Sequence, residues 1–345
     1  MLPFATQLLS LSSVTMVTAT TTNMATPKQQ QNNATVSQRN LATSPLWSTK
    51  YTAEEFGTKY TDNYRVFLRT ASGIVSAFHD VPMLGGEDGT GVFNMIVEIP
   101  RWSNAKMEIS TKCRMNPIKQ DTKKGRLRFV KNSFPYKGYI WNYGAIPQTW
   151  ENPNVADRHT GEMGDGDPID IIDIGHRVSV IGEVKQVKVL GVLGLVDDGE
   201  TDWKVISIDV SDPLAPELND IADVTRVMPG LLEATREWFG TYKIPGSDAG
   251  PNVFAFGGEA KGKDFAVSVI METHEEWRKL VHEEMENVNG LSCENVDVVG
   301  SPYRIGAEYA DAVREGLPAH TDPAPLPHDI DVMYYLSDEQ KRGEK

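Results

Sequence analysis

The alternation of apolar and polar residues predicts a series of short strands through the middle of the chain. Residues 94–99 and 107–109 are rich in residues that favour β-structure. Residues 126–130 alternate, so the two arginines of this segment fall on one face and Leu127 and Phe129 on the other. Further strands are predicted over residues 169–174, 183–196 and 203–210. The connections carry glycine and proline turns instead of helices of crossover length, which favours a compact antiparallel barrel over a parallel α/β sheet.

Helical periodicity comes later in the chain. Residues 230–239 carry one apolar stripe, and Gly240 is suited to end this helix. The stripe consists of Leu231, Leu232, Thr235, Trp238 and Phe239. A longer helix is predicted from Asp264 to about Glu284, with a buried side made of Val267, Ile270, Trp277 and Leu280. From about residue 290 the chain is irregular and rich in proline, and we expect a tail that wraps the domain or meets a partner subunit. The predicted fold class is mainly β, or α+β, with helices flanking the strands.

The first 50 residues differ from the rest of the chain. They hold no acidic residue and contain long runs of Ser, Thr, Asn and Gln, a composition typical of a disordered extension. Residues 51–345 are then predicted to form a single domain. The lack of acids also fits a targeting segment for a mitochondrion or plastid, although arginine is scarce. Met24 can instead be the physiological start, which would leave a cytoplasmic protein.

Charge and cysteine content narrow the functional classes. The chain has 345 residues and a formal net charge of −14. Binding to nucleic acid or to anionic membranes needs a basic surface, so this charge argues against both classes of protein. An anionic substrate would therefore have to meet a local cluster of positive charge. Cys113 and Cys293 provide neither a disulfide framework nor a metal-ligand pattern, which fits a reducing compartment. The sequence holds no run of about 18 apolar residues that could form a transmembrane helix.

The most informative stretch is the acidic cluster at residues 164–174. Asp165, Asp167 and Asp170 lie within six positions, next to an isoleucine-rich run suited to a buried strand. Carboxylates buried together raise each other's pKa, and a bound cation removes this cost. With no His or Cys in the cluster, its oxygen ligands favour Mg²⁺, Ca²⁺ or Mn²⁺ over Zn²⁺. An EF-hand loop needs an acid or amide at its fifth position, and counted from Asp165 that position is Ile169, so an EF-hand is excluded. An acidic surface turn stays open as the alternative.

A second acidic cluster, residues 197–202, falls between two predicted strands. Hairpin turns favour Asp and Gly for geometric reasons, so this cluster alone does not establish a site. Lys106 and Glu108 share one face of a predicted strand, which would place a cation beside a metal ligand. Further donors suited to phosphate oxygens are Arg128, Tyr139, Tyr143, Tyr242 and Lys243.

This combination of carboxylates and cations is typical of phosphoryl transfer. Metals there bridge phosphate oxygens, and cations neutralise charge on the leaving group. The sequence has no Walker loop, no kinase glycine-rich loop and no Gly-x-Ser-x-Gly elbow. Residues 274–278 miss the zincin pattern because the fifth residue is Arg278, and the seven histidines form no cluster. We therefore expect a metal-dependent enzyme of phosphoryl transfer.

Residues 165–170, Asp-Gly-Asp-Pro-Ile-Asp, resemble the signature of the family I soluble inorganic pyrophosphatases, which has acids at its first, third and sixth positions. Blocks similar to the eukaryotic type of this family are found at residues 97–108, 124–130, 139–150, 199–204 and 242–245. The resemblance implies hydrolysis of inorganic pyrophosphate to two orthophosphates by a metal-activated water, with several Mg²⁺ ions that Mn²⁺ or Zn²⁺ can replace. It also implies a five-stranded, OB-like antiparallel barrel flanked by helices, and a homodimer.

By position, the resemblance assigns a role to each candidate site residue. The implied metal ligands are Asp165, Asp170, Asp202, Asp167, Asp197 and Glu108. The implied substrate-binding residues are Arg128, Lys106, Lys204, Tyr242, Lys243 and Tyr143. Asp167 is also the implied base that helps to deprotonate the attacking water, Tyr139 the proton donor to the leaving phosphate, and Glu98 an acid behind the metal ligands. A phenol has a pKa near 10 and is protonated at neutral pH, which suits the role given to Tyr139.

Three other interpretations stay open from the sequence. A non-catalytic scaffold would keep the fold while losing the matched acids or cations, and the sequence has lost none of them. An OB-like oligonucleotide binder would need a basic track with stacking aromatic residues. The third is a related hydrolase of short polyphosphates that uses Zn²⁺ or Mn²⁺ in place of Mg²⁺.

Overall fold

The structure is a computed structural model, and it describes residues 50–247 and 249–343. The predicted extension over residues 1–50 therefore lies outside the described residues, apart from Lys50. Within the described part of the chain, every helix is too short or too polar to cross a membrane.

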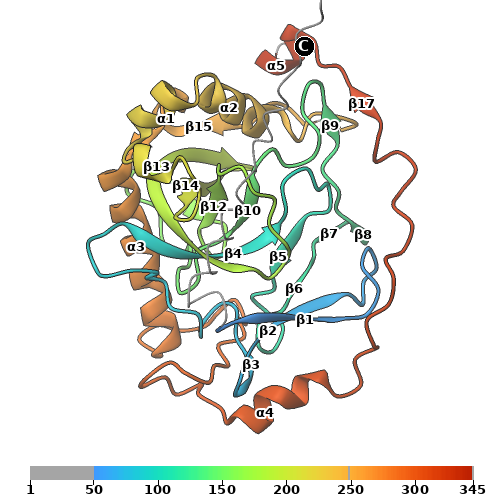
Figure 1. Cartoon of the computed structure of the whole chain (residues 1–345), viewed down its shortest axis with the longest axis vertical. Coiled ribbons are helices and arrows are strands. Elements are labelled where there is room, and N and C mark those ends of the chain that lie inside the picture. Colours follow the sequence, from blue (N-terminus) through green and yellow to red (C-terminus); the bar gives the residue numbers. More distant parts are fainter. Residues whose placement is uncertain (1–49, 248, 344–345) are drawn as a thin grey trace, which may run out of the picture. The chain divides into compact units, whose positions relative to one another are not determined.

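Five strands form a closed barrel (Figure 1). They are β4 (Val92–Ile99), β10 (Asn142–Ala145), β12 (Asp170–Asp173), β13 (Val184–Asp197) and β14 (Glu200–Asp209). Hydrogen bonds link them in the order β14, β12, β10, β4 and β13, and β13 pairs with β14 to close the ring. This ring is the predicted five-stranded barrel, but its pairs are not all antiparallel, because β12 and β14 are parallel. Five strands cannot alternate in direction around a closed ring, so one pair must run the same way.

A second sheet lies beside the barrel. It consists of β1 (Thr52–Phe56), β2 (Arg65–Thr70), β3 (Gly73–Val75), β5 (Met107–Ile109) and β6 (Ile118–Gln120). Of these, the sequence predicts only β5. The sheet is tied to barrel strand β4 because the backbone N–H of Ile109 donates to Oε1 of Glu98 at 2.6 Å.

The strand predicted over residues 126–130 is shorter than expected. Only β8 (Arg126–Leu127) has strand geometry, paired with β7 (Thr122–Lys123) in a hairpin. The next residues change partner, since Phe129 forms an isolated bridge with Ala105. This change of partner interrupts the ladder and ends the strand.

Three α-helices follow the barrel strands, and the sequence predicts two of them. They are α1 (Ile221–Val227), which is not predicted, α2 (Leu231–Thr241) and α3 (Lys263–Val281). Gly240 does not end α2, contrary to the prediction, because the helix continues to Thr241. The ring of Phe254 occupies the space beside this glycine, at 3.3 Å from where a Cβ would lie.

The chain after residue 290 has long irregular stretches and two short helices, α4 (Ala307–Asp311) and α5 (Asp338–Arg342). It packs on the elements described above: the N–H of Ile74 donates to Oδ1 of Asp311 at 2.8 Å. Its strand β17 (Met333–Tyr334) pairs in parallel with β9 (Asn132–Ser133). The remaining short elements are β11 (Met163–Gly164), β15 (Val253–Phe254), β16 (Lys261–Gly262) and the 3₁₀ turns Ala215–Glu217, Ala255–Gly258 and Ala312–Arg314.

Alternate residues of the barrel strands belong to two separate buried clusters. One cluster contains Ile96, Ile172 and Ile206. The other contains Val97, Ile171 and Val205 together with Val269 and Ile270 of α3. Because side chains alternate along a strand, the polar residues two positions from the first set share its face. These residues are Glu98, Asp170 and Lys204.

A buried ion cluster holds the other end of three barrel strands. Lys185 of β13 is fully buried, and its Nζ lies 2.7 Å from carboxylates of Asp173 on β12 and Asp209 on β14. Burial alone would raise the pKa of Asp209, but the charge of Lys185 lowers it to about 2. The cluster therefore ties the strands together at the end away from Asp170 and Lys204.

Candidate active site

The structure brings all the residues that the sequence assigns to a site into one cavity of about 220 Å³. The walls include Glu98, Lys106, Glu108, Arg128, Tyr139, Tyr143, Asp165, Asp167, Asp170, Asp197, Asp202, Lys204, Tyr242 and Lys243. They come from β4, β5, β10, β12, β13 and β14 and from the segments next to β8, β11 and α2. Their individual roles stay predictions, but their assembly in one place makes this cavity the candidate active site.

The parallel pair β12 and β14 carries the centre of the site. Asp170 and Lys204 are neighbours across this pair, and Asp202 lies two residues before Lys204 on the same face. Nζ of Lys204 forms ion pairs with both carboxylates, and the hydroxyl of Tyr143 donates to Asp170. Burial would lower the pKa of Lys204, but the two carboxylates raise it well above its usual range. Lys204 is therefore charged at neutral pH.

Tyr143 reaches the cavity from an irregular point in β10. The pairing of β10 with β4 shifts between Tyr143 and Gly144. A Cβ atom at Gly144 would lie 1.9 Å from the carbonyl oxygen of Ile96, so the two strands can come this close only at a glycine. The bulge therefore depends on Gly144 and directs the neighbouring residue, Tyr143, toward Lys204. Nζ of Lys204 lies 3.1 Å from the Tyr143 hydroxyl.

The loop between β11 and β12 carries Asp165 and Asp167. The backbone N–H of Asp167 donates to Oδ1 of Asp165 at 2.9 Å, which fixes the turn. Burial, followed by the charges of Asp167 and Asp170, raises the pKa of the Asp165 carboxyl well above its usual range. Burial and the charge of Glu108 raise the pKa of Asp167 to about 7. Both shifts reflect acids crowded together without enough cations.

Helix α2 positions a tyrosine and a lysine at the end of β13. Its last residue is followed by Tyr242, whose ring stacks on Trp238 with 4.9 Å between ring centroids. The hydroxyl of Tyr242 donates to Oδ2 of Asp197 at 3.2 Å, and Nζ of Lys243 forms an ion pair with the same carboxylate. The packing of one helix thus places both donors beside the last residue of β13.

A third group of charges lies on β5 and after β8. Nζ of Lys106 lies 2.9 Å from Oε2 of Glu108, its neighbour on one strand face. Asp121 links the two cations of this group, since its Oδ2 lies 3.5 Å from Lys106 Nζ and 2.5 Å from Arg128 Nη1. The sequence analysis does not identify Asp121, because a single acid at the start of a hairpin carries no motif.

Tyr139 and Glu98 are ionisable groups buried in the cavity wall. Tyr139 is 2% exposed, and burial raises the pKa of its phenol although the charges of Lys106 and Arg128 oppose this. Burial, followed by the charge of Asp170, raises the pKa of the Glu98 carboxyl. Both groups are thereby favoured in their protonated forms.

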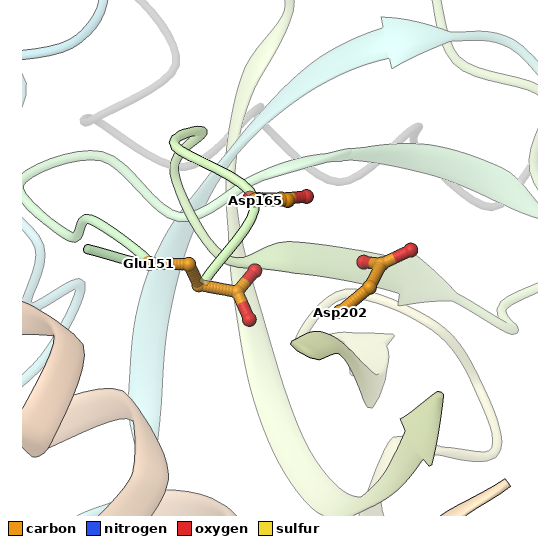
Figure 2. Close-up of side chains that lie close together, drawn as sticks. All are labelled: Glu151, Asp165 and Asp202. Carbon is orange, nitrogen blue, oxygen red and sulfur yellow. The ribbon is translucent and has the colours of Figure 1, made fainter. Parts of the chain in front are cut away.

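Glu151 is a functional candidate that the sequence analysis misses. One oxygen each of Glu151, Asp165 and Asp202 lie within 4.8 Å of one another, and Figure 2 shows the three side chains converging from separate segments. Burial, with the charges of Asp165 and Asp202, raises the pKa of the Glu151 carboxyl. The available signal is its place directly after Trp150, the last residue of a block that resembles the pyrophosphatase family.

Three further charged residues at the rim of the cavity have no role assigned from the sequence, although Asp198 and Glu200 belong to the second acidic cluster at residues 197–202. Lys123, Asp198 and Glu200 line it from two hairpins, and Lys123 lies 4.0 Å from Asp198. Both side chains of that pair are largely exposed, so the ion pair is weak and is screened by salt.

The residues present fit a divalent cation. The acids supply only oxygen ligands, which suit hard cations such as Mg²⁺. Among the described residues, Lys204 pairs with Asp170 and Asp202, but no Lys, Arg or His side chain pairs with Glu151 or Asp165. Oε2 of Glu151 is buried and accepts no hydrogen bond from the described residues. The excess of unpaired buried carboxylates calls for positive charge from outside the chain.

A closed barrel with a cavity that sets carboxylates against Lys, Arg and Tyr defines a metal-dependent enzyme that acts on phosphates. The family model described as inorganic pyrophosphatase matches residues 95–278. With the relatives described next, this match shows that the chain belongs to the inorganic pyrophosphatase family and is an enzyme of that family.

The relatives agree in sequence and in structure. Inorganic pyrophosphatase of Mus musculus is 52% identical over 288 residues, which cover 83% of this chain and 98% of the relative. The structure of inorganic pyrophosphatase from Schistosoma japonicum has a TM-score of 0.78 and 46% identity, covering 83% of this chain and all (100%) of that one. Truncated vacuolar soluble pyrophosphatase of Trypanosoma cruzi, solved in complex with PPi, has a TM-score of 0.63 and 42% identity, covering 68% and 92%. The resemblance seen in the sequence is confirmed.

Proposed function

We propose that this chain hydrolyses inorganic diphosphate to two orthophosphates and that Mg²⁺ is its metal. The observation that carries the proposal is one cavity in which buried acids face Lys106, Arg128, Lys204 and Lys243. A diphosphate presents many anionic oxygens in a small volume, so it needs cations on one side and bound metal on the other. The family relative from Trypanosoma cruzi that was solved with PPi supports this substrate.

The cationic wall is proposed to bind the substrate. Arg128 offers a planar fork of donors to phosphate oxygens, and Asp121 fixes its orientation. Lys106 and Lys243 each pair with an acid of the cavity, so a bound diphosphate competes with those acids for the same ammonium groups. The remaining donors assigned to substrate oxygens are Lys204, Tyr143 and Tyr242.

The acidic wall is proposed to hold the metal ions. Asp165, Asp170 and Asp202 are assigned to the ions bound most tightly, and Asp167, Asp197 and Glu108 to further ions, with Glu98 behind them. When bound, Mg²⁺ would draw charge from the phosphate oxygens and lower the pKa of a water molecule beside it. Mn²⁺ and Zn²⁺ are the proposed substitutes.

Two residues are proposed to move protons. Positive charge bound beside Asp167 lowers its pKa from about 7, so that its carboxylate is ionised and accepts a proton from the attacking water. The phenol of Tyr139 is kept protonated by burial and donates to the oxygen of the departing phosphate. The attack breaks the phosphoanhydride bond and leaves two orthophosphates.

An assay of phosphate release tests this function. We expect rapid release from diphosphate with Mg²⁺, much slower release from ATP, and loss of activity with a chelator that returns when Mg²⁺ is added. A Lys204→Met variant, which leaves Asp170 and Asp202 without their cation, is expected to lose activity. Activity that survives chelation, or a preference for ATP, would show that the proposal is wrong.

Assembly and compartment are separate proposals. The eukaryotic type of the family implies a homodimer, which light scattering of the purified protein will test. A cytoplasmic location, with a mitochondrion or plastid as the alternative, depends on residues 1–50. Sequencing the N-terminus of the protein isolated from cells will decide between them.

A further inference from the structure

We infer that the hairpin of β7 and β8 captures diphosphate at the mouth of the active-site cavity, before the substrate reaches the residues that act on it. The capturing groups are the exposed side chains of Lys123, Lys124 and Arg126. The inference rests on the proposed diphosphate substrate and adds the side from which the anion enters. It gives a role to three cations that have none in the assignments above.

The first support is the crowding of like charge on this hairpin. Lys123 and Arg126 are direct partners across the two strands, so their side chains leave the same face. Lys124 and Gly125 form the turn between them, both with positive φ, 54° and 70°. This geometry is typical of a type I′ turn, in which asparagine or glycine is more usual than lysine. Three cations therefore lie within four residues, and an anion that binds them relieves their repulsion.

The second support is the scarcity of acids beside these cations. Lys123 pairs with Asp198 at 4.0 Å, and both side chains are largely exposed, so the pair contributes little. With the residues that the structure describes, Lys124 and Arg126 form no ion pair. On a chain with a formal net charge of −14, this hairpin is a local region of positive charge that is free to attract an anion.

The third support is the position of the hairpin between solvent and the cavity. Lys123 lines the cavity and also an adjoining groove of about 490 Å³, which Lys124 lines as well. Arg128 and Lys243 of the proposed substrate-binding wall line both spaces too. Among the described residues that line the groove, Asp198 is the only acid. Cations thus lead from the turn of the hairpin to the proposed substrate-binding residues.

The groove is suited to capture and not to hydrolysis. Asp165, Asp170 and Asp202, which are assigned to metal ions, line the cavity but not the groove. An anion in the groove therefore meets lysine and arginine without the ions proposed to activate water. Diphosphate stays an anion when one Mg²⁺ is bound to it, so both forms are attracted. Positive charge at the entrance of a site raises association rates by roughly 10-fold to 1000-fold in favourable cases.

The test is the triple variant Lys123→Gln, Lys124→Asn, Arg126→Gln, assayed by phosphate release from diphosphate at fixed Mg²⁺. At low salt we expect kcat/KM to fall about tenfold while kcat stays within about twofold, because the lost groups act before the chemical step. At about 1 M salt the Debye length is about 3 Å, and we expect the difference from the parent to disappear. The melting temperature should equal that of the parent or exceed it, since repulsion on the hairpin is removed.

The matched control removes the same amount of charge elsewhere. Lys112→Gln, Arg114→Gln and Arg236→Gln change exposed residues that line neither the cavity nor the groove. We expect kcat/KM of this triple variant to stay within about twofold of the parent at both salt concentrations. The inference is overturned if kcat/KM of the hairpin variant does not fall, falls equally at low and high salt, or falls because kcat falls.

Lys124→Asn alone carries the test if the triple variant does not fold. Asparagine suits the positive φ of this turn, so only the charge is lost, and a fall in kcat/KM of about two- to threefold is expected at low salt. Lys124→Arg keeps the charge and should keep parental kcat/KM, whereas parental kcat/KM for Lys124→Asn would contradict the inference. Failure of the proposed function gives a different result, since the parent itself would then release no phosphate from diphosphate.

Discussion

At the scale of single residues, Tyr139 depends most clearly on its surroundings. Its ring lies edge-on to Tyr143 and packs against Trp238, with centroid distances of 5.1 and 4.9 Å. Burial raises the pKa of its phenol against the effect of nearby cations, so the proton is retained across the neutral range. Such a group is suited to give its proton only to a strongly basic oxygen, as on a departing phosphate.

Tyr139→Phe removes the hydroxyl and keeps the ring contacts. We expect kcat for diphosphate hydrolysis to fall about 100-fold or more, with a small change in KM, because the donor acts after the substrate is bound. Steady-state phosphate release will measure both constants. Tyr136→Phe is the control, since its hydroxyl donates to Glu237 at 2.8 Å outside the cavity. A fall in kcat of only a few fold for Tyr139→Phe would contradict the role of Tyr139 as proton donor.

The sequence identifies most of the acids and cations of the site because they stand in ordered blocks with distinctive spacing. Asp121 and Glu151 escape it for a physical reason. Each is a single acid outside any motif, and its importance comes from a partner that the fold places beside it, Arg128 across the β7–β8 hairpin for one and the distant Asp202 for the other. Only the folded arrangement brings such partners together.

At the scale of elements, strand β10 determines the position of Tyr143 relative to Asp170 on β12. Its bulge brings Gly144 against the Ile96 carbonyl of β4, at a distance that excludes a Cβ. A shift of this pairing would move Tyr143 away from Asp170, to which it donates a hydrogen bond. Stability and site geometry therefore depend on the same glycine.

Gly144→Ala forces a methyl group against backbone, which cannot rotate away. We expect the free energy of unfolding to fall by about 3 kcal/mol or more, and activity of the folded fraction to fall as Tyr143 shifts. Urea denaturation will measure the first effect. Gly250→Ala is the control, because a Cβ there meets nothing within 4 Å, and a change of less than about 0.5 kcal/mol is expected. Equal stability of the two variants would contradict the close approach.

The elements that the sequence predicts are those with a strong period. Strands β13 and β14 and helix α3 are long and patterned, and they lie close to the predicted ranges. Strand β2 is missed because three consecutive residues, Val66, Phe67 and Leu68, are all buried, so no alternation marks it. The pairing of Phe129 with Ala105 could not be predicted either, since it depends on a segment outside its own hairpin.

At the scale of the whole molecule, His79 joins helix α3 to the tail. Its Nδ1 accepts the indole N–H of Trp277 at 2.8 Å, and its Nε2 donates to the carbonyl of Ser292 at 2.9 Å. The contact with Trp277 needs the neutral ring, because a protonated Nδ1 cannot accept a hydrogen bond. Burial lowers the pKa of His79 from 6.5 to about 4.

This shift predicts weaker folding in acid. Between pH 6.5 and 4 the unfolded chain binds the proton and the folded chain does not, so the free energy of unfolding falls as the pH is lowered, by up to about 3 kcal/mol for this group. Denaturation across this range with saturating Mg²⁺ will measure the slope. His79→Gln should remove the contribution of His79 from the pH dependence of the free energy of unfolding. His328→Gln, at an exposed position, should leave that pH dependence unchanged. Identical slopes for the parent and His79→Gln would contradict the prediction.

The closed ring of strands also determines when binding competence returns during refolding. Acids and lysine of the site lie on β12 and β14, and these two strands meet only through the long-range parallel pairing of residues 170–173 with residues 204–207. A half-assembled sheet or an isolated hairpin holds only part of the constellation. Recovery of divalent-ion binding in a stopped-flow experiment is therefore expected to keep pace with the final cooperative step, and not with early formation of local structure.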